Sequence, residues 1–525
     1  MSTEVSQPDF TAEATDYEIG QDNIRPFGLD IHNPVFAISS TVIIAFVVLV
    51  LLLPEGSAVF FGWLRPWLTS TFDWLLMTAT NIFVLFCLFL VVSPWGKIRL
   101  GGADAKPDFS YSGWFAMLFA AGMGIGLMFF AVLEPVYHFQ NPPLGVDPAN
   151  AEAAQAVAMA ATIYHWGLHP WAIYAVVALT LAFFTFNNGL PLTVRSAFFP
   201  LLGDKVWGWP GHIIDTLAVF ATLFGLATSL GFGAQQATAG LDYLFGIPAT
   251  DTTRVVLIIC ITGVALISVM AGLDAGVKRL SEINMILAVL LLLFVIVVGP
   301  TLAIVTDFFS NIGAYFENLL PLANFVGRED IDFMHGWSTF YWAWWISWSP
   351  FVGMFIARVS RGRTVREFII CVLLIPTAVS ILWMTAFGGT AIWQIVNQGQ
   401  ESVAQVVRDY VPELSLFVML ETLPLASITS FIGITLVIVF FVTSSDSGSL
   451  VIDTITAGGK VDSPVIQRIF WATFEGLVAI ALLLGGGLAS LQAAAVATGL
   501  PFAIVLVVMC WGLFKAMRVD PQMAR

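Results

Sequence analysis

The sequence predicts an all-α integral membrane protein with twelve transmembrane helices, and three observations support this fold class. The chain has 525 residues, of which 58% are hydrophobic and 11% are charged, whereas soluble domains carry about 25% charged residues. Apolar runs long enough to cross a ~30 Å hydrocarbon layer recur along it. The basic residues gather in alternate connections between these runs. The predicted spans are 35–53, 72–93, 113–132, 164–186, 213–230, 253–271, 279–305, 337–359, 367–387, 428–447, 466–484 and 496–514.

The Lys and Arg residues predict the orientation of these spans. With twelve spans and the N-terminus inside, the 21 basic residues all fall on the cytoplasmic side except Arg65, Arg254, Arg328 and Arg408. Cytoplasmic loops carry an excess of Lys and Arg. We therefore expect a multi-pass protein of the cell membrane with both termini in the cytoplasm.

Charge and motifs exclude several function classes. The net charge of −14 argues against a nucleic-acid partner. The four cysteines lie in apolar runs without metal-ligand spacing, and no catalytic triad, zinc-protease, Walker or dinucleotide-binding pattern is present in the sequence. We therefore expect neither an enzyme nor a bound cofactor, apart from coupling ions.

The order of the spans predicts an internal repeat. Spans three and eight each begin a block of five helices. Because five is odd, the two blocks have opposite orientations, which is typical of inverted repeats in secondary transporters. The expected segments are a disordered acidic cytoplasmic tail (1–34), two additional transmembrane helices (35–111), the first five-helix repeat (112–305), an amphipathic interfacial helix and loop (306–336), the second repeat (337–514) and a short cytoplasmic tail (515–525).

Aromatic residues form a column in the eighth span. At 100° per residue, Trp337, Tyr341, Trp344, Trp345 and Trp348 fall within about 100° of one helical face, and Trp348 lies roughly 16 Å into the membrane. Membrane tryptophans usually gather at the interfaces. The column has two interpretations, helix packing or a cage whose ring faces bind an organic cation at ~2 kcal/mol or more per contact.

The fourth span carries a second aromatic group, Trp166, Trp171 and Tyr174, spread over about 140° of arc. This arc is wide enough to wrap a ligand, although an outer-leaflet aromatic belt also explains it. Pro170 is expected to bend the helix. We interpret His165 and His169 as hydrogen-bonded structural groups.

Alternating glycines interrupt the third span at Gly122, Gly124 and Gly126. Each costs about 1 kcal/mol relative to alanine in a helix. The glycines either allow close helix packing or mark an unwound segment lining a cavity. In the second case the backbone N–H groups of Gly122, Met123 and Gly124 are free to bind a carboxylate, and freed carbonyl groups to coordinate a cation.

Adjacent hydroxyl groups lie in the inner half of the tenth span, at Thr443 and Ser444. They are potential oxygen ligands for a hard cation, or they bond back to their own helix. Asp446 is interpreted as structural. The middles of the third, fourth and eighth spans contain no acidic residue, which favours a zwitterionic ligand that brings its own negative charge.

Four stretches together resemble the betaine/carnitine/choline transporter family: AAGMGIGLMFF from Ala120, HWGLHPWAIY (165–174), GWSTFYWAWWISWSPFVGMFIARVSRGRTVREF (336–368) and FFVTSSDS (440–447). The resemblance covers about 33–514. It implies a LeuT-like fold of two inverted five-helix repeats preceded by two helices, a homotrimer and a place in the bacterial inner membrane.

The resemblance also implies the site residues. Trp166, Trp171, Tyr174 and Trp345 match the family's cage, and Trp344 and Trp348 match neighbouring contacts. One sodium site maps onto the backbone of Ala120, Met123 and Phe440 and the hydroxyl groups of Thr443 and Ser444. A second maps near Thr222 and Phe351, but Leu226 stands where sodium-coupled relatives carry a further hydroxyl group, so the number of sodium ions stays open.

The function implied is sodium-coupled symport of a zwitterionic onium solute, glycine betaine or dimethylsulfoniopropionate. Proton-coupled choline carriers tend to have an aspartate at the position of Gly126, and sodium-independent carnitine exchangers have an arginine near Asn284 and Met285; neither is present here. Two other classes stay open, namely an aromatic-lined channel and a membrane receptor for quaternary ammonium ligands.

Overall fold

The protein is an all-α integral membrane protein. The computed structural model describes residues 9–122, 124–271 and 276–523. Within these residues ten helices are long and apolar enough to cross a membrane. The helices that carry or flank the first predicted spans are α1 (Asn33–Leu52), α2 (Pro54–Val92), α3 (Tyr111–Gly122), α4 (Ile125–Gln140), α5 (Ala151–Trp166), α6 (Leu168–Phe186), α7 (Phe199–Leu202), α8 (Trp209–Phe245), α9 (Asp251–Met270) and α10 (Gly276–Val298).

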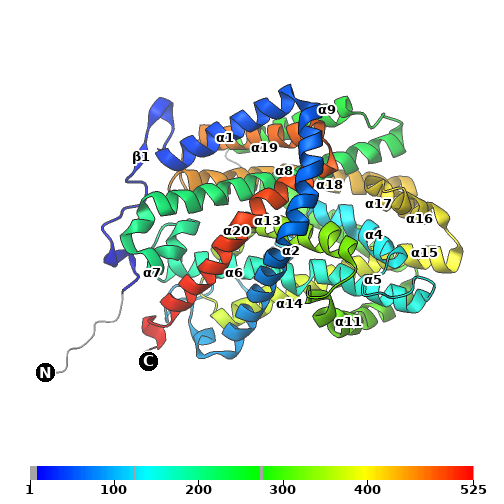
Figure 1. The fold of residues 1–525 in the computed structure, drawn as a ribbon, viewed down its shortest axis with the longest axis horizontal. Coiled ribbons are helices and arrows are strands. Elements are labelled where there is room, and N and C mark those ends of the chain that lie inside the picture. Colours follow the sequence, from blue (N-terminus) through cyan, green and yellow to red (C-terminus); the bar gives the residue numbers. More distant parts are fainter. Residues whose placement is uncertain (1–8, 123, 272–275, 524–525) are drawn as a thin grey trace.

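The second half of the chain continues in the same way (Figure 1). Its helices are α11 (Thr301–Ala323), α12 (Ile331–Phe333), α13 (Thr339–Val359), α14 (Val365–Met384), α15 (Thr390–Gln398), α16 (Glu401–Arg408), α17 (Ser415–Glu421), α18 (Ala426–Thr456), α19 (Val465–Leu484) and α20 (Leu488–Met517). The only strands among the described residues, β1 (Asn23–Ile24) and β2 (Ile31–His32), form a short antiparallel hairpin.

Two of the predicted spans are not among the ten apolar helices. The span 113–132 falls on α3 and α4, because α3 ends at Gly122 and α4 begins at Ile125. The span 337–359 falls on α13, which is continuous and whose tryptophans lower its mean hydropathy. A count of twelve crossings and the division into inverted repeats therefore stay predictions.

One predicted boundary is wrong. The seventh span was expected to run to residue 305, but α10 ends at Val298, and the amphipathic helix α11 already begins at Thr301. The reason is the Gly299–Pro300 pair, since proline lacks the N–H that would continue the α10 ladder.

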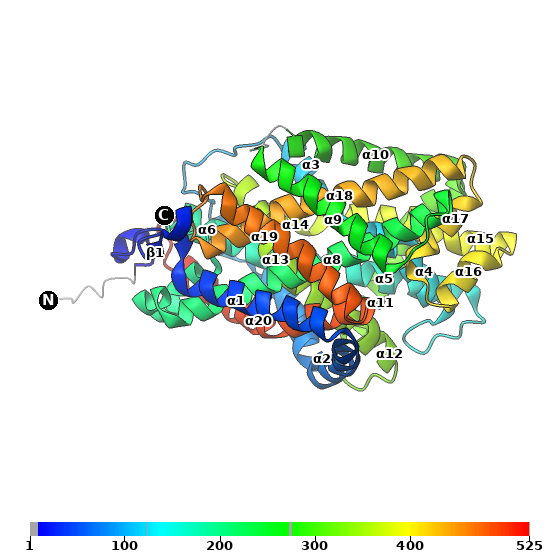
Figure 2. The same cartoon turned by 90° about the horizontal axis from the view of Figure 1, so that it is seen from above.

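The connections predicted on one side of the membrane meet at one end of the molecule. The Leu100 N–H donates to the carbonyl oxygen of Arg363 at 3.0 Å, and the side chains of Asn187 and Gln522 donate to the carbonyl oxygen of Arg99 at 3.1 and 3.0 Å. The hairpin β1–β2, α7 and the C-terminal end of α20 lie at this end, and α15 and α16 lie at the other (Figures 1 and 2). The described ends of the chain therefore lie on the same side.

The acidic N-terminal segment differs from its prediction. We expected residues 1–34 to be a disordered tail, but the part described, from Asp9 on, packs on the rest of the chain. The Ala12 N–H donates to the carbonyl oxygen of Asn188, and Tyr17 stacks on Trp207 with ring centroids 4.2 Å apart. Asp30 pairs with Lys460 at 2.7 Å. Composition predicted disorder because it does not record these long-range partners.

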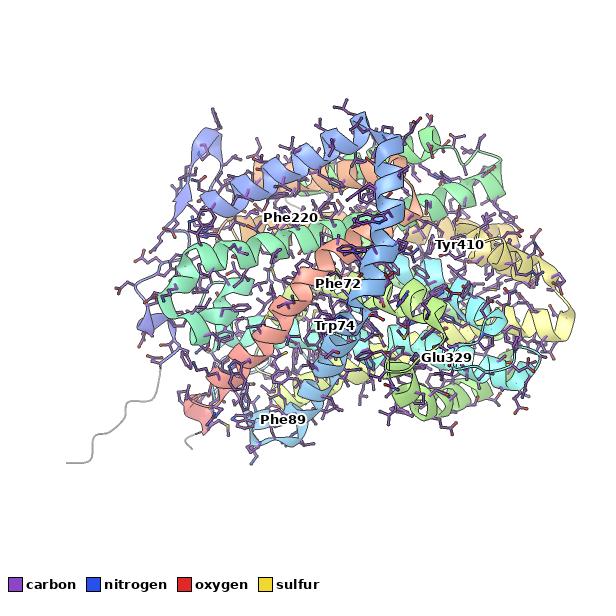
Figure 3. All side chains as sticks on the ribbon, in the orientation of Figure 1. Phe72, Trp74, Phe89, Phe220, Glu329 and Tyr410 are labelled. Atoms are coloured by element: carbon purple, nitrogen blue, oxygen red, sulfur yellow. The ribbon has the colours of Figure 1, made fainter. Side chains whose placement is uncertain are left out.

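Large apolar side chains cover the outer surface of the helices. Trp63, Trp67, Trp74 and Phe89 on α2 are all exposed, and Figure 3 labels Trp74 and Phe89 projecting along this helix. Contiguous apolar surface of this extent is typical of a lipid-facing helix. This surface agrees with a multi-pass protein of the cell membrane.

Helix α13 is enclosed over most of its length. Every residue from Trp337 to Pro350 is buried. A Cβ added at Gly353 would lie 2.5 Å from Val177 Cγ1 of α6, and one added at Gly225 of α8 would lie 3.1 Å from the Trp348 backbone nitrogen. These glycines let α6 and α8 approach α13 as closely as backbones can. Close packing from both sides therefore holds the aromatic helix.

The connection before α12 generates a prediction. Asp330 accepts a hydrogen bond from the Leu144 N–H at 3.0 Å and forms a two-pronged ion pair with Arg328, so it joins two loops at the end of the molecule that carries α15 and α16. Burial acts to raise its pKa, but the hydrogen bonds from Arg328 and Leu144 and the Arg328 charge outweigh burial and hold the pKa of Asp330 below its usual value.

We expect Asp330→Asn to lower the free energy of unfolding by about 1–2 kcal/mol at pH 7, because the charged acceptor is lost. A carboxylate whose pKa is lower in the folded state stabilises the protein fully at pH values above its unfolded-state pKa of about 3.9. This stabilisation is lost as the pH falls through the folded-state pKa. The difference in melting temperature between variant and parent should therefore shrink from pH 7 toward pH 3. The exposed neighbour Asp332→Asn is the control, and an equal loss there would contradict the assignment.

Candidate functional site

A cavity lies among the aromatic side chains of α5, α6 and α13. The space between atoms in this region is about 410 Å³, which includes open space outside it, and its free volume is about 20 Å³, room for about one water molecule. Six of the eight aromatic residues singled out in the sequence line it, together with residues next to the break between α3 and α4. The lining residues are Ala121, Gly124, Gly126, Leu127, Trp166, Pro170, Trp171, Tyr174, Trp344, Trp345, Trp348 and Ser380.

Two helix breaks open this region. The backbone of Gly124 is extended between α3 and α4, so the interruption expected from the glycine pattern is present; Met123 lies outside the described residues. The second break is Gly167, between α5 and α6, where a Cβ would lie 2.6 Å from the Ile163 carbonyl oxygen. It places Trp166 on one short helix and Trp171 on the next, so both reach the same cavity.

The indole rings present both faces and edges to one another. Trp344 and Trp345 are stacked with centroids 4.8 Å apart, Trp166 meets Trp345 edge to face at 4.9 Å, and Tyr174 meets it at 6.0 Å and 82°. The negative faces of several rings thus border one small volume. This arrangement suits an organic cation, whose attraction to each ring is about 0.5–2 kcal/mol.

The polar groups of these rings fall into two sets. The Trp345 indole N–H donates to the carbonyl oxygen of His165 at 2.9 Å and the Trp166 N–H donates to Glu134 at 2.7 Å, so both are satisfied. In contrast, Trp344 Nε1, Trp348 Nε1 and the Tyr174 hydroxyl group are buried and have no hydrogen-bond partner among the described residues. An unsatisfied buried donor costs about 1–3 kcal/mol. These donors are therefore available to an acceptor on a ligand.

The aromatic column of α13 divides into two parts. Trp344, Trp345 and Trp348 line the cavity, whereas Trp337 and Tyr341 pack against Phe130 of α4. Helix packing therefore describes Trp337 and Tyr341, and the cage stays a prediction for the three tryptophans that line the cavity.

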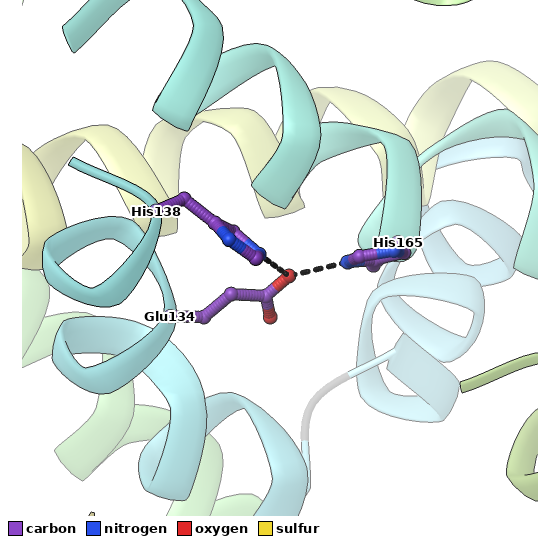
Figure 4. A group of neighbouring side chains, drawn as sticks. All are labelled: Glu134, His138 and His165. Atoms are coloured by element: carbon purple, nitrogen blue, oxygen red, sulfur yellow. Dashed lines mark hydrogen bonds and ion pairs between the residues drawn. The ribbon is translucent and has the colours of Figure 1, made fainter. Parts of the chain in front are cut away.

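Behind the cavity lies a buried carboxylate, Glu134 of α4 (Figure 4). Its Oε1 lies 2.6 Å from His165 Nδ1 and 3.5 Å from His138 Nε2. Its Oε2 accepts hydrogen bonds from Trp166 and from the Tyr341 hydroxyl group. His165 and His169 are hydrogen-bonded, His169 to Asn81 at 3.0 Å, in agreement with the structural role predicted for them.

The ligand atoms of Glu134, His138 and His165 lie within 4.8 Å of one another, so spacing alone would allow a metal ion. Both carboxylate oxygens already accept hydrogen bonds from protein donors. We therefore assign this cluster to hydrogen bonding.

Glu134 is the residue that sequence reasoning missed. The sequence was considered for acidic residues only in the middles of the third, fourth and eighth spans, and Glu134 lies two residues beyond the predicted end of the third. A signal was present, since a lone Glu followed four residues later by His138 interrupts an apolar run, and an ionisable pair in such a run needs a buried partner.

None of the predicted sodium ligands that the structure describes is among the residues that line the cavity. The Thr443 hydroxyl group donates to the carbonyl oxygen of Val439 at 3.0 Å, and that of Thr222 donates to Ala218 at 2.7 Å. Both hydroxyl groups thus bond back to their own helix, which was one of the two alternatives given by the sequence. Their oxygen lone pairs remain free to coordinate a cation. Phe351 packs on Trp348. The sodium sites at Ala120, Met123, Phe440, Thr443 and Ser444, and at Thr222 and Phe351, stay predictions.

Comparison with known proteins identifies the family. The model of the betaine/carnitine/choline family transporters matches residues 34–522. The chain belongs to the betaine/carnitine/choline transporter family. Betaine transporters of this family are similar to it over nearly its whole length: a glycine betaine/proline/choline transporter of Vibrio parahaemolyticus is 61% identical, covering 100% of this chain and 99% of the relative.

Two further relatives agree. Glycine betaine transporter 1 of the same organism is 55% identical over 98% of this chain and 99% of its own. A glycine betaine transporter of Acinetobacter baylyi is 46% identical over 93% of this chain and 74% of its own length. The protein is therefore a betaine-type transporter of the betaine/carnitine/choline family, and its role is transport.

The cavity generates a packing prediction. A Cβ at Gly126 would lie 2.8 Å from Trp166 and 2.9 Å from Trp344, so both indoles must move. We expect Gly126→Ala to lower the free energy of unfolding by about 1–3 kcal/mol, the usual cost of overpacking, measured as the melting temperature in detergent. Gly113→Ala is the matched control, because its Cβ would meet only Ser110 Oγ at 3.4 Å. A Gly126 variant as stable as this control would mean that the rings are free to separate.

Proposed function

We propose that the protein is a sodium-coupled symporter that accumulates glycine betaine by alternating access. The observation that carries the proposal is the cavity itself, in which aromatic ring faces and unpartnered donors border one space. The proposal further includes a homotrimeric assembly, as the resemblance implies.

The chemistry of the cavity suits both ends of a betaine. A trimethylammonium group has no N–H to donate, so ring faces rather than hydrogen-bond acceptors are its natural partners. A carboxylate accepts hydrogen bonds, and Trp344, Trp348 and Tyr174 offer buried donors for it. No carboxylate side chain is among the residues that line the cavity. A zwitterion is therefore better matched than a cation alone.

The relatives support this substrate. The names of the three relatives described above all include glycine betaine, and two of those names include no other solute. Dimethylsulfoniopropionate has a comparable onium head and carboxylate tail, so it is the first competitor to test. Choline lacks the carboxylate that would satisfy the free donors, and we propose that it binds more weakly.

Sodium is proposed as the coupling ion. A net-neutral zwitterion gains nothing from the membrane potential, whereas each sodium ion supplies about 2.3 kcal/mol per 100 mV. At about 1.4 kcal/mol per tenfold, one ion sustains roughly a fortyfold solute gradient per 100 mV and two sustain more than a thousandfold. Leu226 in place of a hydroxyl side chain favours a single ion.

Replacement of Trp345 by leucine tests the cage. Because one cation–π contact of about 2 kcal/mol is lost, we expect Trp345→Leu to raise the KM for glycine betaine uptake at least tenfold. Trp209→Leu, at a tryptophan that is 65% exposed, should leave KM within twofold. Uptake with the parental KM in Trp345→Leu would eliminate the cage.

Ion replacement in proteoliposomes tests the coupling. Potassium in place of sodium should abolish accumulation of glycine betaine, and Thr443→Ala should raise the sodium concentration for half-maximal uptake several-fold. Thr435→Ala is the matched control, since Thr435 lies two turns earlier on α18 and makes the same backbone bond, to Phe431 at 2.8 Å. Full accumulation without sodium would overturn the coupling. Flux without saturable accumulation would indicate a channel, and binding without flux a receptor.

A further inference from the structure

Glu134 does not line the cavity, but it contacts a residue that does. Its side chain is fully buried on α4, and its Oε2 accepts the indole N–H of Trp166 at 2.7 Å. A hydrogen bond to an ionised carboxylate is about twice as strong as one between neutral groups. The orientation of the Trp166 ring therefore depends on a side chain that is outside the cavity.

The same carboxylate reaches a second ring of the cage through His165. Glu134 Oε1 lies 2.6 Å from His165 Nδ1, and the other ring nitrogen lies 2.8 Å from Ser338 Oγ. The imidazole is thus held at both nitrogens, which holds the last turn of α5. The backbone carbonyl of His165 in that turn accepts the Trp345 indole N–H at 2.9 Å.

We propose that Glu134 is a positioning residue for the onium cage, fixing Trp166 directly and Trp345 through His165. Cation–π attraction depends on the cation lying over the ring face, so a freely rotating indole loses most of it. The carboxylate supplies the fixed acceptor that keeps both rings edge to face at 4.9 Å. This inference rests on the proposed function only in taking glycine betaine as the ligand.

A double-mutant cycle tests the direct contact. Glu134→Ala should raise the KM for glycine betaine about tenfold, with the maximal rate within twofold. Glu134→Gln keeps an oxygen acceptor, so its KM should lie at least halfway back to the parental value on a logarithmic scale. Trp166→Phe keeps a ring but has no N–H to donate, so adding Glu134→Ala to it should raise KM clearly less than the tenfold expected in the parent, and the remaining effect should act through His165 and Trp345.

Equal effects of Glu134→Ala in the parental and Trp166→Phe backgrounds would overturn the proposal, because the direct hydrogen bond to Trp166 would then contribute nothing to binding. An unchanged KM in Glu134→Ala, or a glutamine variant no better than alanine, would overturn it too. The control is Asp453→Asn, a buried carboxylate on α18 that accepts a hydrogen bond from Gln467 at 3.0 Å. Neither Asp453 nor Gln467 lines the cavity, so the KM of Asp453→Asn should stay within twofold of the parental value.

A second measurement requires no substrate. Ultraviolet resonance Raman difference spectra, parent minus Trp166→Phe, isolate the indole N–H band of Trp166. The band should report a strong hydrogen bond in the parent and a weaker or absent one in Glu134→Ala. Should the alanine variant fail to fold, the isosteric glutamine variant should still shift the band toward weaker bonding. An unshifted band would overturn the role of Glu134, whereas failure of the parent to bind glycine betaine would overturn only the proposed substrate.

Discussion

The close packing of α13 between α6 and α8 is the constraint on which the site depends. Lipid tails are as apolar as leucine, so a buried tryptophan in a membrane protein gains stability from contact with its neighbours rather than from escaping water. Gly353 and Gly225 provide this contact by letting neighbouring backbones approach. The Ser347 hydroxyl group adds a bond to the carbonyl oxygen of Ala495 on α20 at 3.0 Å. An aromatic helix held from three sides keeps its rings in one arrangement.

The site itself is formed where helices are interrupted. An unbroken helix offers a ligand only side chains, because its backbone groups bond to one another. The breaks between α3 and α4 and between α5 and α6 border the cavity and change the direction of the chain. Irregular backbone at membrane depth is tolerated where it is enclosed by protein or lines a cavity. Both conditions hold at Gly124, which is buried and lines the cavity.

The carboxyl group of Glu134 lies behind the rings rather than among them. A carboxylate inside the cavity would attract any small cation and would be costly without one. Glu134 instead lies beyond Trp166, with its oxygens occupied by protein donors. In the proposed function, selectivity for a methylated onium group comes from the ring faces, which bind a poorly hydrated cation better than a strongly hydrated metal ion.

Much of this was available from the sequence. Hydrophobic runs and the distribution of Lys and Arg determined the class of protein and the order of its spans, because the bilayer imposes length and polarity on each segment separately. The tryptophans of α13 and the glycines around the break between α3 and α4 were recognisable as candidates for the same local reason. Composition misjudged residues 9–34, whose order comes from partners such as Asn188 and Lys460, far away along the chain.

Tertiary structure alone decided which candidates meet. Trp344 and Trp337 lie on one helical face, yet only Trp344 lines the cavity, since Trp337 packs against Phe130 and Tyr137 of α4. The role of Glu134 depends in the same way on three helices converging. Periodicity along a chain determines which face of a helix a residue occupies, but the neighbour across that face is set by packing between segments distant in sequence.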